Sequence, residues 1–178
     1  MFKKYIKNKN GYVDMITCIP IVIAIVLLMV FFLDLASYSQ KYLAIRKTAD
    51  SVLRIISLQG TLNTGVPSYI PGGDEEFWKN NEIKNFLEDI IEQTGLKNSN
   101  TVSITLDVER DFPNGNRIQN IDLLSGTSNV RIDYESNVTI KIKYIYKWAL
   151  LGKVSNVGIS RTVSSEYKHR NQGWSAGE

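Results

Sequence analysis

The sequence predicts an α+β protein with a long N-terminal helix, transmembrane and then amphipathic, followed by a small head that holds a short helix and an antiparallel β-sheet. Three observations support this prediction. Met15–Leu33 is an uninterrupted apolar run. Apolar residues then recur at helical spacing as far as Ile56. After Gly95 the apolar period falls to two, which is the period of a strand with one buried face.

The apolar run is long enough to cross a membrane. Met15–Leu33 carries no formal charge, and as a helix it would span about 28 Å, close to the ~30 Å hydrocarbon core of a bilayer. A buried core helix is one alternative, but such helices usually keep a polar edge, and this run offers only Thr17 and Cys18. A secretory signal peptide is another, but its apolar region is usually shorter and ends in a small-x-small cleavage site. We therefore expect residues 12–34 to form a single transmembrane helix.

Residues 1–11 form a basic leader without an acid. Its lysines are Lys3, Lys4, Lys7 and Lys9. The ten residues that follow the run, Asp34–Leu43, contain Lys41 as their only base. The positive-inside rule therefore predicts a cytoplasmic N-terminus and an extracytoplasmic head in a single-pass protein of the cell membrane.

Residues 35–60 are expected to continue the helix outside the membrane. An apolar stripe follows one face at spacings of three and four: Leu35, Tyr38, Tyr42, Ile45, Ala49, Val52 and Ile56. Gly60 is the expected C-terminal stop. Two roles fit the stripe, packing on the chain's own head or a coiled coil with a partner, and three heptads are too few to choose between them.

The head is expected to occupy residues 61–170. Residues 61–76 are rich in Gly, Pro and Ser and predict a loop. A second helix is expected within Glu75–Thr94, with Asp74 as its N-cap and Gly95 at its end. Its apolar face would hold Phe77, Ile83, Phe86, Ile90 and Ile91.

The rest of the head alternates as strands. In the first, the apolar residues Val102, Ile104, Leu106 and Val108 alternate with a solvent-facing set, Ser103, Thr105, Asp107 and Glu109. Shorter alternations follow at Arg117–Asp122 and Val130–Tyr134, and a long strand at Val138–Lys147. An apolar bend, Trp148–Val154, leads to a last strand with Val157, Ile159, Val163 and Tyr167 inward. Successive strands without intervening helices predict an antiparallel sheet, and residues 171–178 form a polar tail.

The sequence offers no catalytic constellation. The only histidine, His169, lies in the polar segment that ends the chain, and Cys18 has no second cysteine with which to form a disulfide or a metal site. The net charge is +3, and the leader lysines account for it, which argues against a nucleic-acid surface. The acids Asp74, Glu75 and Glu76 fit a helix start better than a cation site. We therefore expect no enzyme activity, no cofactor, no metal and no nucleic-acid partner.

Four residues mark the start of the membrane run: Gly11, Tyr12, Asp14 and Pro20. Ordinary explanations exist for three of them, since Gly11 suits a flexible joint, Asp14 suits a helix N-terminus, and a proline kink is tolerated in a membrane helix. Taken with the apolar helix and the α+β head, they resemble the type IV pilin class. The nearest resemblance is to TadE/TadF-like pseudopilins of tight-adherence (Tad) pilus systems, whose N-terminal pattern runs acid, five mostly apolar residues, then Pro. Here that pattern is Asp14, Met-Ile-Thr-Cys-Ile, Pro20, and the resemblance is specific over about residues 7–40.

The resemblance implies a minor pilin or pseudopilin of a Tad or type IV pilus, or of a related secretion apparatus, assembled through its N-terminal helix. A prepilin peptidase would cut after Gly11 and leave Tyr12 as the new N-terminus. Asp14 would then pair with the free amine of a neighbouring subunit, although main pilins usually carry Glu at the fifth residue after the cut, whereas Asp14 is the third. The implied partners are the lipid bilayer, the peptidase, other pilin or pseudopilin subunits and the pilus assembly platform, and the subunit would reside in the membrane or in a surface filament. The alternative is an uncleaved single-pass membrane protein whose extracytoplasmic head binds a ligand or a partner.

Overall fold

The chain has the predicted α+β fold in a computed structural model, which describes residues 2–65, 77–96, 102–109 and 117–166, with side chains from Cys18 onward. The elements in chain order are α1 (Phe2–Gln59), β1 (Thr61–Leu62), α2 (Asn80–Gln93), β2 (Ser103–Glu109), β3 (Ile118–Asp122), β4 (Val130–Arg131), β5 (Asn137–Lys147) and β6 (Val154–Ser164). The chain divides into two compact units, described separately below. The anchor unit is Met1–Gln40 with Lys147–Val154, and the head unit is Lys41–Tyr146 with Ser155–Glu178.

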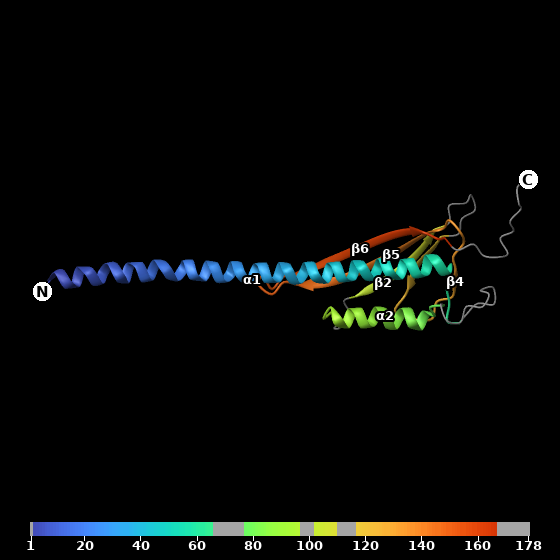
Figure 1. The fold of residues 1–178 in the computed structure, drawn as a ribbon, viewed down its shortest axis with the longest axis horizontal. Coiled ribbons are helices and arrows are strands. Elements are labelled where there is room, and N and C mark those ends of the chain that lie inside the picture. The colour runs from blue at the N-terminus through green and yellow to red at the C-terminus, as the bar shows by residue number, and fades with distance from the viewer. Residues whose placement is uncertain (1, 66–76, 97–101, 110–116, 167–178) are drawn as a thin grey trace, which may run out of the picture. The chain divides into compact units, whose positions relative to one another are not determined.

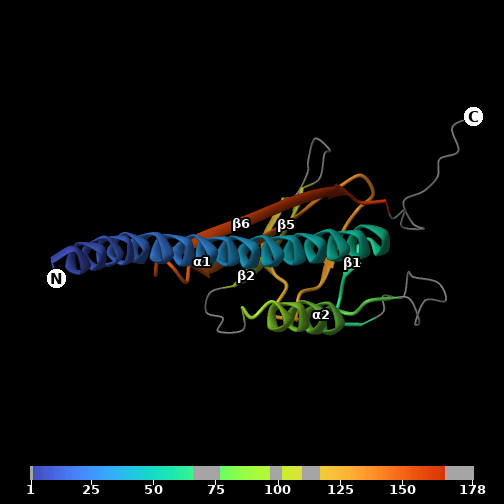
Figure 2. The same cartoon turned by 60° about the vertical axis from the view of Figure 1, so that its left-hand side comes forward.

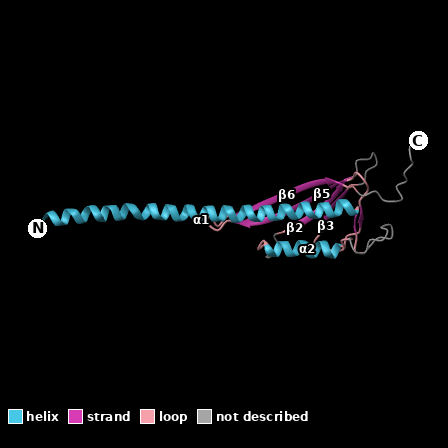
Figure 3. Ribbon diagram, in the orientation of Figure 1, coloured by secondary structure: helices cyan, strands magenta, loops and turns pink. Residues whose placement is uncertain are grey.

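The helix α1 is longer than the sequence predicts. It begins at Phe2 rather than near the apolar run, and it continues without a break through Gly11 and Pro20 (Figure 3). A single glycine costs a helix only about 1 kcal/mol, which the flanking helical residues offset. The predicted stop is confirmed, because Gly60 adopts a φ of 63° and its amide donates to Ile56 O at 3.0 Å. Glycine reaches this left-handed conformation at little cost, so the helix ends here.

The C-terminal part of α1 is a core element of the head unit. Its most buried apolar residues, each at most 4% exposed, are Ile45, Ala49, Val52, Leu53 and Ile56. The stripe therefore packs on the chain's own head, which is the first of the two roles considered. Leu35 does not belong to it, since in the anchor unit that side chain is 39% exposed.

The main sheet has four strands in the order β3-β2-β5-β6. β2 pairs antiparallel with β3 and with β5, and in the second pairing Ile104 lies opposite Ile142 and Leu106 opposite Ile140. The predicted antiparallel sheet is confirmed. β6 follows β5 as a hairpin, with Thr139 Oγ1 and Thr162 Oγ1 at 2.8 Å.

A second, two-stranded sheet closes the end of α1. β1 pairs antiparallel with β4, and the Ile132 amide donates to Gly60 O at 2.9 Å. The sequence predicts a loop from residue 61 and a strand of the main sheet at Val130–Tyr134, so the first prediction was wrong at Thr61 and Leu62 and the second at Val130 and Arg131. Strands of two residues are too short to leave a period in the sequence.

The helix α2 lies beside the C-terminal part of α1, with the main sheet on another side of α1 (Figures 1 and 2). The Lys79 amide at its start donates to Glu82 Oε2 at 2.7 Å, and the predicted N-cap, Asp74, lies outside the described residues. Ile83 and Leu87 are its buried apolar residues, whereas Phe86 and its neighbours Ile90 and Ile91 are only half-buried. A small internal space where the three elements meet is lined by Ile45 and Thr48 of α1, Leu87, Ile90 and Ile91 of α2, and Ile104 and Ile142 of the sheet.

The sequence predicts the wrong exposure for two side chains on the strands. Asp107, predicted to face solvent, is 6% exposed, because the Asn120 amide of β3 and the Lys141 side chain of β5 pair with its carboxylate. Val163, predicted to point inward, is 37% exposed, because β6 is an edge strand with a neighbour on one side only. Tyr167 lies outside the described residues.

The buried carboxylate of Asp107 has two partners in the head unit. The Asn120 amide donates to Asp107 Oδ1 at 2.8 Å, and Lys141 Nζ lies 2.5 Å from Oδ2. Burial by itself raises the pKa of Asp107, but the Asn120 hydrogen bond and the Lys141 ammonium outweigh it, so the pKa lies below its ordinary value. Asn120 holds a positive φ of 58°, a conformation that asparagine tolerates better than most residues.

Candidate functional site

The apolar run presents its side chains to the outside of the anchor unit. From Cys18 to Leu33 every residue is exposed except the half-buried Val30, and Leu33 is 70% exposed. Among the described residues, the part of α1 from Cys18 onward is the one helix long and apolar enough to cross a membrane, and only 6% of its most apolar window is buried. This exposure argues against the core-helix alternative, because so large an apolar surface requires lipid or another protein to cover it.

The predicted cleavage and assembly residues all lie within α1. Gly11, Tyr12 and Asp14 precede the residues whose side chains the structure describes, so only their helical backbone is known. Pro20 is exposed inside the helix. The structure brings no second element to these four residues within its described part, and their roles in cleavage and assembly stay predictions.

Asp34 is a site residue that the sequence reasoning missed. It is the first charged residue after the apolar run, yet it is only 8% exposed. Its Oδ2 accepts hydrogen bonds from the Ala149 amide at 2.8 Å and from the Leu150 amide at 3.3 Å. A carboxylate is a strong acceptor for backbone amides, and here it fastens the turn between β5 and β6 to the helix. We call Lys147–Val154 the hairpin tip.

The hairpin tip is a closed turn with its own hydrogen bonds. The Trp148 amide donates to Lys153 O at 2.9 Å, and the Gly152 amide donates to Trp148 O at 3.0 Å. Gly152 has a φ of 59°, which explains the glycine at this position. The amides of Ala149 and Leu150 have no partner inside these two bonds, so an external acceptor such as Asp34 completes the turn.

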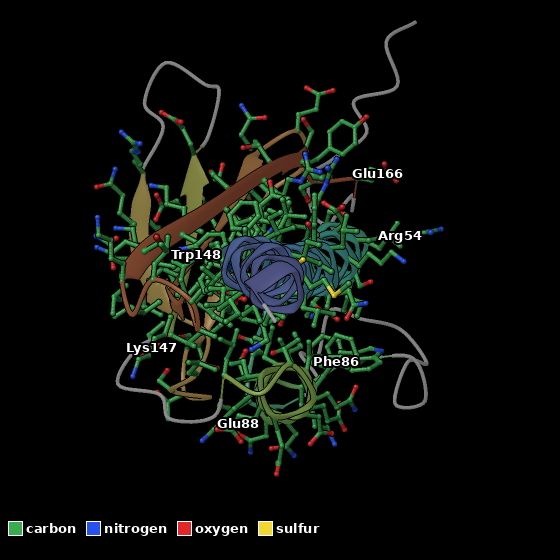
Figure 4. The ribbon with its side chains drawn as sticks, turned by 90° about the vertical axis from the view of Figure 1, so that its left-hand side faces the viewer. Arg54, Phe86, Glu88, Lys147, Trp148 and Glu166 are labelled. Atoms are coloured by element: carbon green, nitrogen blue, oxygen red, sulfur yellow. The ribbon has the colours of Figure 1, made fainter. Side chains whose placement is uncertain are left out.

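Two aromatic rings hold the same turn against α1. The rings of Tyr38 and Trp148 stack with their centroids 5.4 Å apart and their planes at 25°. Viewed from the N-terminal end of α1, Trp148 lies beside the helix and the Lys147 side chain extends outward (Figure 4). Tyr38 stands one helical turn after Asp34, so the two residues share a face, and this spacing is the signal in the sequence that could have extended the stripe to Asp34.

The described residues of the head unit form a groove of a size that a small ligand would fill. It has a volume of about 490 Å³ and is lined by Val102, Ser103, Lys143, Tyr144, Ile145, Asn156, Val157 and Gly158. Lys143 supplies a positive charge, and Ser103 and Asn156 supply hydrogen-bonding groups. The lining contains neither a histidine nor a carboxylate.

No protein-family model, curated protein or solved structure matches this chain in comparisons with each. What the structure establishes is a pilin-like architecture, in which a long helix with an apolar N-terminal part is followed by an antiparallel sheet that packs with the C-terminal part of the same helix in the head unit. That architecture and the residues at the start of the run are the basis for the function proposed next.

Proposed function

We propose that this chain is a minor pilin or pseudopilin, a structural subunit of a Tad or type IV pilus or of a related secretion apparatus. The observation that carries the proposal is the exposure of α1 from Cys18 to Leu33, on the same helix whose later residues form the core of the head. Such a helix leaves its apolar half available to lipid before assembly and to other helices after it. The proposal assigns no catalysis to the chain.

Contacts between subunits would use the exposed apolar half of α1. The stripe residues from Ile45 to Ile56 are occupied by the chain's own head, so they are not available to a partner helix. Membrane helices associate through packing and polar pairs rather than through the hydrophobic effect, because lipid tails are as apolar as the side chains. A polar pair near Asp14 would therefore help to select one register among many similar apolar contacts.

The proposed polar pair is formed by proteolysis. A cut after Gly11 would create a free amine at Tyr12, and the amine of one subunit would face Asp14 of a neighbour. An unpaired acid near the bilayer core costs up to about 2.5–3.5 kcal/mol on insertion scales, and a neighbouring ammonium offsets that cost. Asp14 would then set the register of adjacent subunits.

The first test is the mass of the N-terminal peptide from the membrane fraction, in cells with and without the candidate prepilin peptidase. A terminus at Tyr12 that depends on the peptidase supports the proposal. Gly11→Ala should abolish the cut, whereas Gly65→Ala should leave it unchanged, since a Cβ at Gly65 meets nothing within 4 Å. An intact Met1 terminus in both strains would refute the cleavage and with it the pilin-class function.

The role of Asp14 calls for a second experiment. Asp14→Ala should reduce crosslinking between subunits in the membrane while leaving the amount of cleaved protein unchanged. Asp50→Ala removes an exposed acid of the head unit instead, and it should leave crosslinking at the wild-type level.

A second candidate function is favoured by the groove of the head unit. An uncleaved single-pass protein that binds a small anionic or polar ligand would use Lys143, Ser103 and Asn156. This candidate requires an intact N-terminus, so the mass measurement separates it from the first.

A further inference from the structure

The hairpin tip has an unusual composition for an exposed turn. Surface turns are dominated by Gly, Pro, Asn, Asp and Ser, whereas this one reads Lys-Trp-Ala-Leu-Leu-Gly-Lys-Val from residue 147 to residue 154. Leu151 is 57% exposed and Val154 is 59% exposed. Lys147 and Lys153 flank them, both exposed, and the segment contains no acid. These apolar side chains face outward although the turn has a packing partner in α1.

The depth of the hairpin tip is fixed by its bond to Asp34. That residue follows Leu33, the last residue of the apolar run, by one helical step of about 1.5 Å. The polar headgroup layer of a bilayer extends roughly 5–7 Å beyond the hydrocarbon core on each side. A turn fastened to Asp34 therefore lies at the level of the headgroups whenever the run occupies the hydrocarbon core.

We infer that the hairpin tip is a second membrane contact, which inserts Leu151 and Val154 into the outer interface of the bilayer that holds α1. Trp148 and Tyr38 lie at the level where amphipathic aromatic rings are enriched in membrane proteins. Lysines at this level extend their ammonium groups toward lipid phosphates while their stems cover apolar surface. This inference rests on the membrane-spanning part of the proposed function, and it does not depend on the cleavage after Gly11.

The charges of the hairpin tip select lipid over a second copy of the same surface. Two tips brought together would oppose Lys147 and Lys153 of one chain to the same lysines of the other, without an acid in either tip. An anionic headgroup layer supplies the missing negative charge, and it attracts each nearby lysine.

The test measures the depth of three labels on the full-length chain in vesicles of phosphatidylcholine and phosphatidylglycerol. Cys18→Ser removes the only native cysteine, and a fluorophore is then placed at Leu151→Cys, at Leu33→Cys or at Gln40→Cys. Leu33 marks the end of the run, and Gln40 lies six residues, about 9 Å, beyond Asp34 on the same unit. Brominated lipid is the quencher, and Val154→Cys repeats the measurement in case a label at Leu151 disturbs the turn.

The labels at Leu151 and Val154 should lose fluorescence to brominated lipid nearly as strongly as the label at Leu33, and clearly more than the label at Gln40. Replacing phosphatidylglycerol by phosphatidylcholine should reduce the loss at the tip but not at Leu33. Quenching at Leu33 with none at the tip overturns this inference and leaves the membrane helix intact. No quenching at Leu33 overturns the membrane helix as well. Protection of the tip from both lipid and aqueous quenchers would mean that protein covers it, which also overturns the inference.

Discussion

Replacing Asp34 by alanine should loosen the hairpin tip. A hydrogen bond to a charged group contributes about 1.5–3 kcal/mol. The Ala149 and Leu150 amides share one oxygen, at 2.8 and 3.3 Å, so we count them as one such bond, about 2 kcal/mol. At about 1.4 kcal/mol per factor of ten, this loss corresponds to a roughly 30-fold increase in the open population of the turn.

Amide hydrogen exchange of the full-length chain in lipid nanodiscs measures that population directly, because exchange of these two amides requires the turn to open. Asp34→Asn should fall between wild type and Asp34→Ala, because an amide oxygen still accepts but carries no charge. Asp50→Ala is the matched control, since its bond to Arg161 joins partly exposed side chains and is worth less than about 1 kcal/mol. Wild-type exchange at Ala149 and Leu150 in Asp34→Ala would show that the carboxylate does not hold the turn.

Three further predictions concern the head unit. Asp107→Ala should lower the free energy of unfolding by about 1–3 kcal/mol at neutral pH. Because the folded pKa of Asp107 lies below its ordinary value, the stability that its carboxylate contributes is present above about pH 4 and disappears as the pH falls through the folded pKa. The unfolding free energies of wild type and Asp107→Ala should therefore converge in an acid titration. Gly126→Ala should destabilise by about 1–2 kcal/mol, because its φ of 66° is left-handed and a Cβ would meet the side chains of α2, whereas Gly158→Ala, with open space around it, should change the denaturation midpoint little. Leu53→Ala should lower the free energy of unfolding, measured by chemical denaturation, by about 2–5 kcal/mol, and Leu43→Ala should lower it by less than about 1 kcal/mol. Leu53 is fully buried, whereas Leu43 is 51% exposed. Equal effects of the two substitutions would contradict the packing of α1 in the head unit.

The long elements of this chain were predictable because their periods extend over many residues. α1 and β5 each bury one face, and repeated burial leaves a repeated apolar signal. Gly60 and Gly95 were recognisable as helix ends because only glycine adopts the left-handed conformation cheaply, and both have positive φ here. The two strands of the small sheet were missed because pairs of residues carry no period.

The site was harder to predict because its central residue contradicts hydropathy. The carboxylate of Asp34 pairs with backbone amides that lie 115 and 116 residues further along the chain. Local sequence patterns do not predict hydrogen-bond donors at such a distance. The sequence places Leu35, the apolar residue next to Asp34, at the start of the stripe. However, Asp34 lies four residues before Tyr38, so Asp34 shares the helical face of Tyr38. Asp107 was missed for a related reason, since its partners Asn120 and Lys141 lie 13 and 34 residues further along the chain.

The end of α1 is closed by the last part of the described chain, and this has a consequence for biogenesis. The Glu166 amide donates to Ser57 O at 3.1 Å, and Ser165 Oγ approaches the same carbonyl at 3.5 Å from a position 108 residues later. Contacts between such distant residues form late, because the whole intervening loop must first be ordered. If the head is exported behind its helix, as the proposed function requires, it would stay open until β6 had crossed the membrane. During that interval the apolar face of residues 45–56 would need protection from other nascent chains.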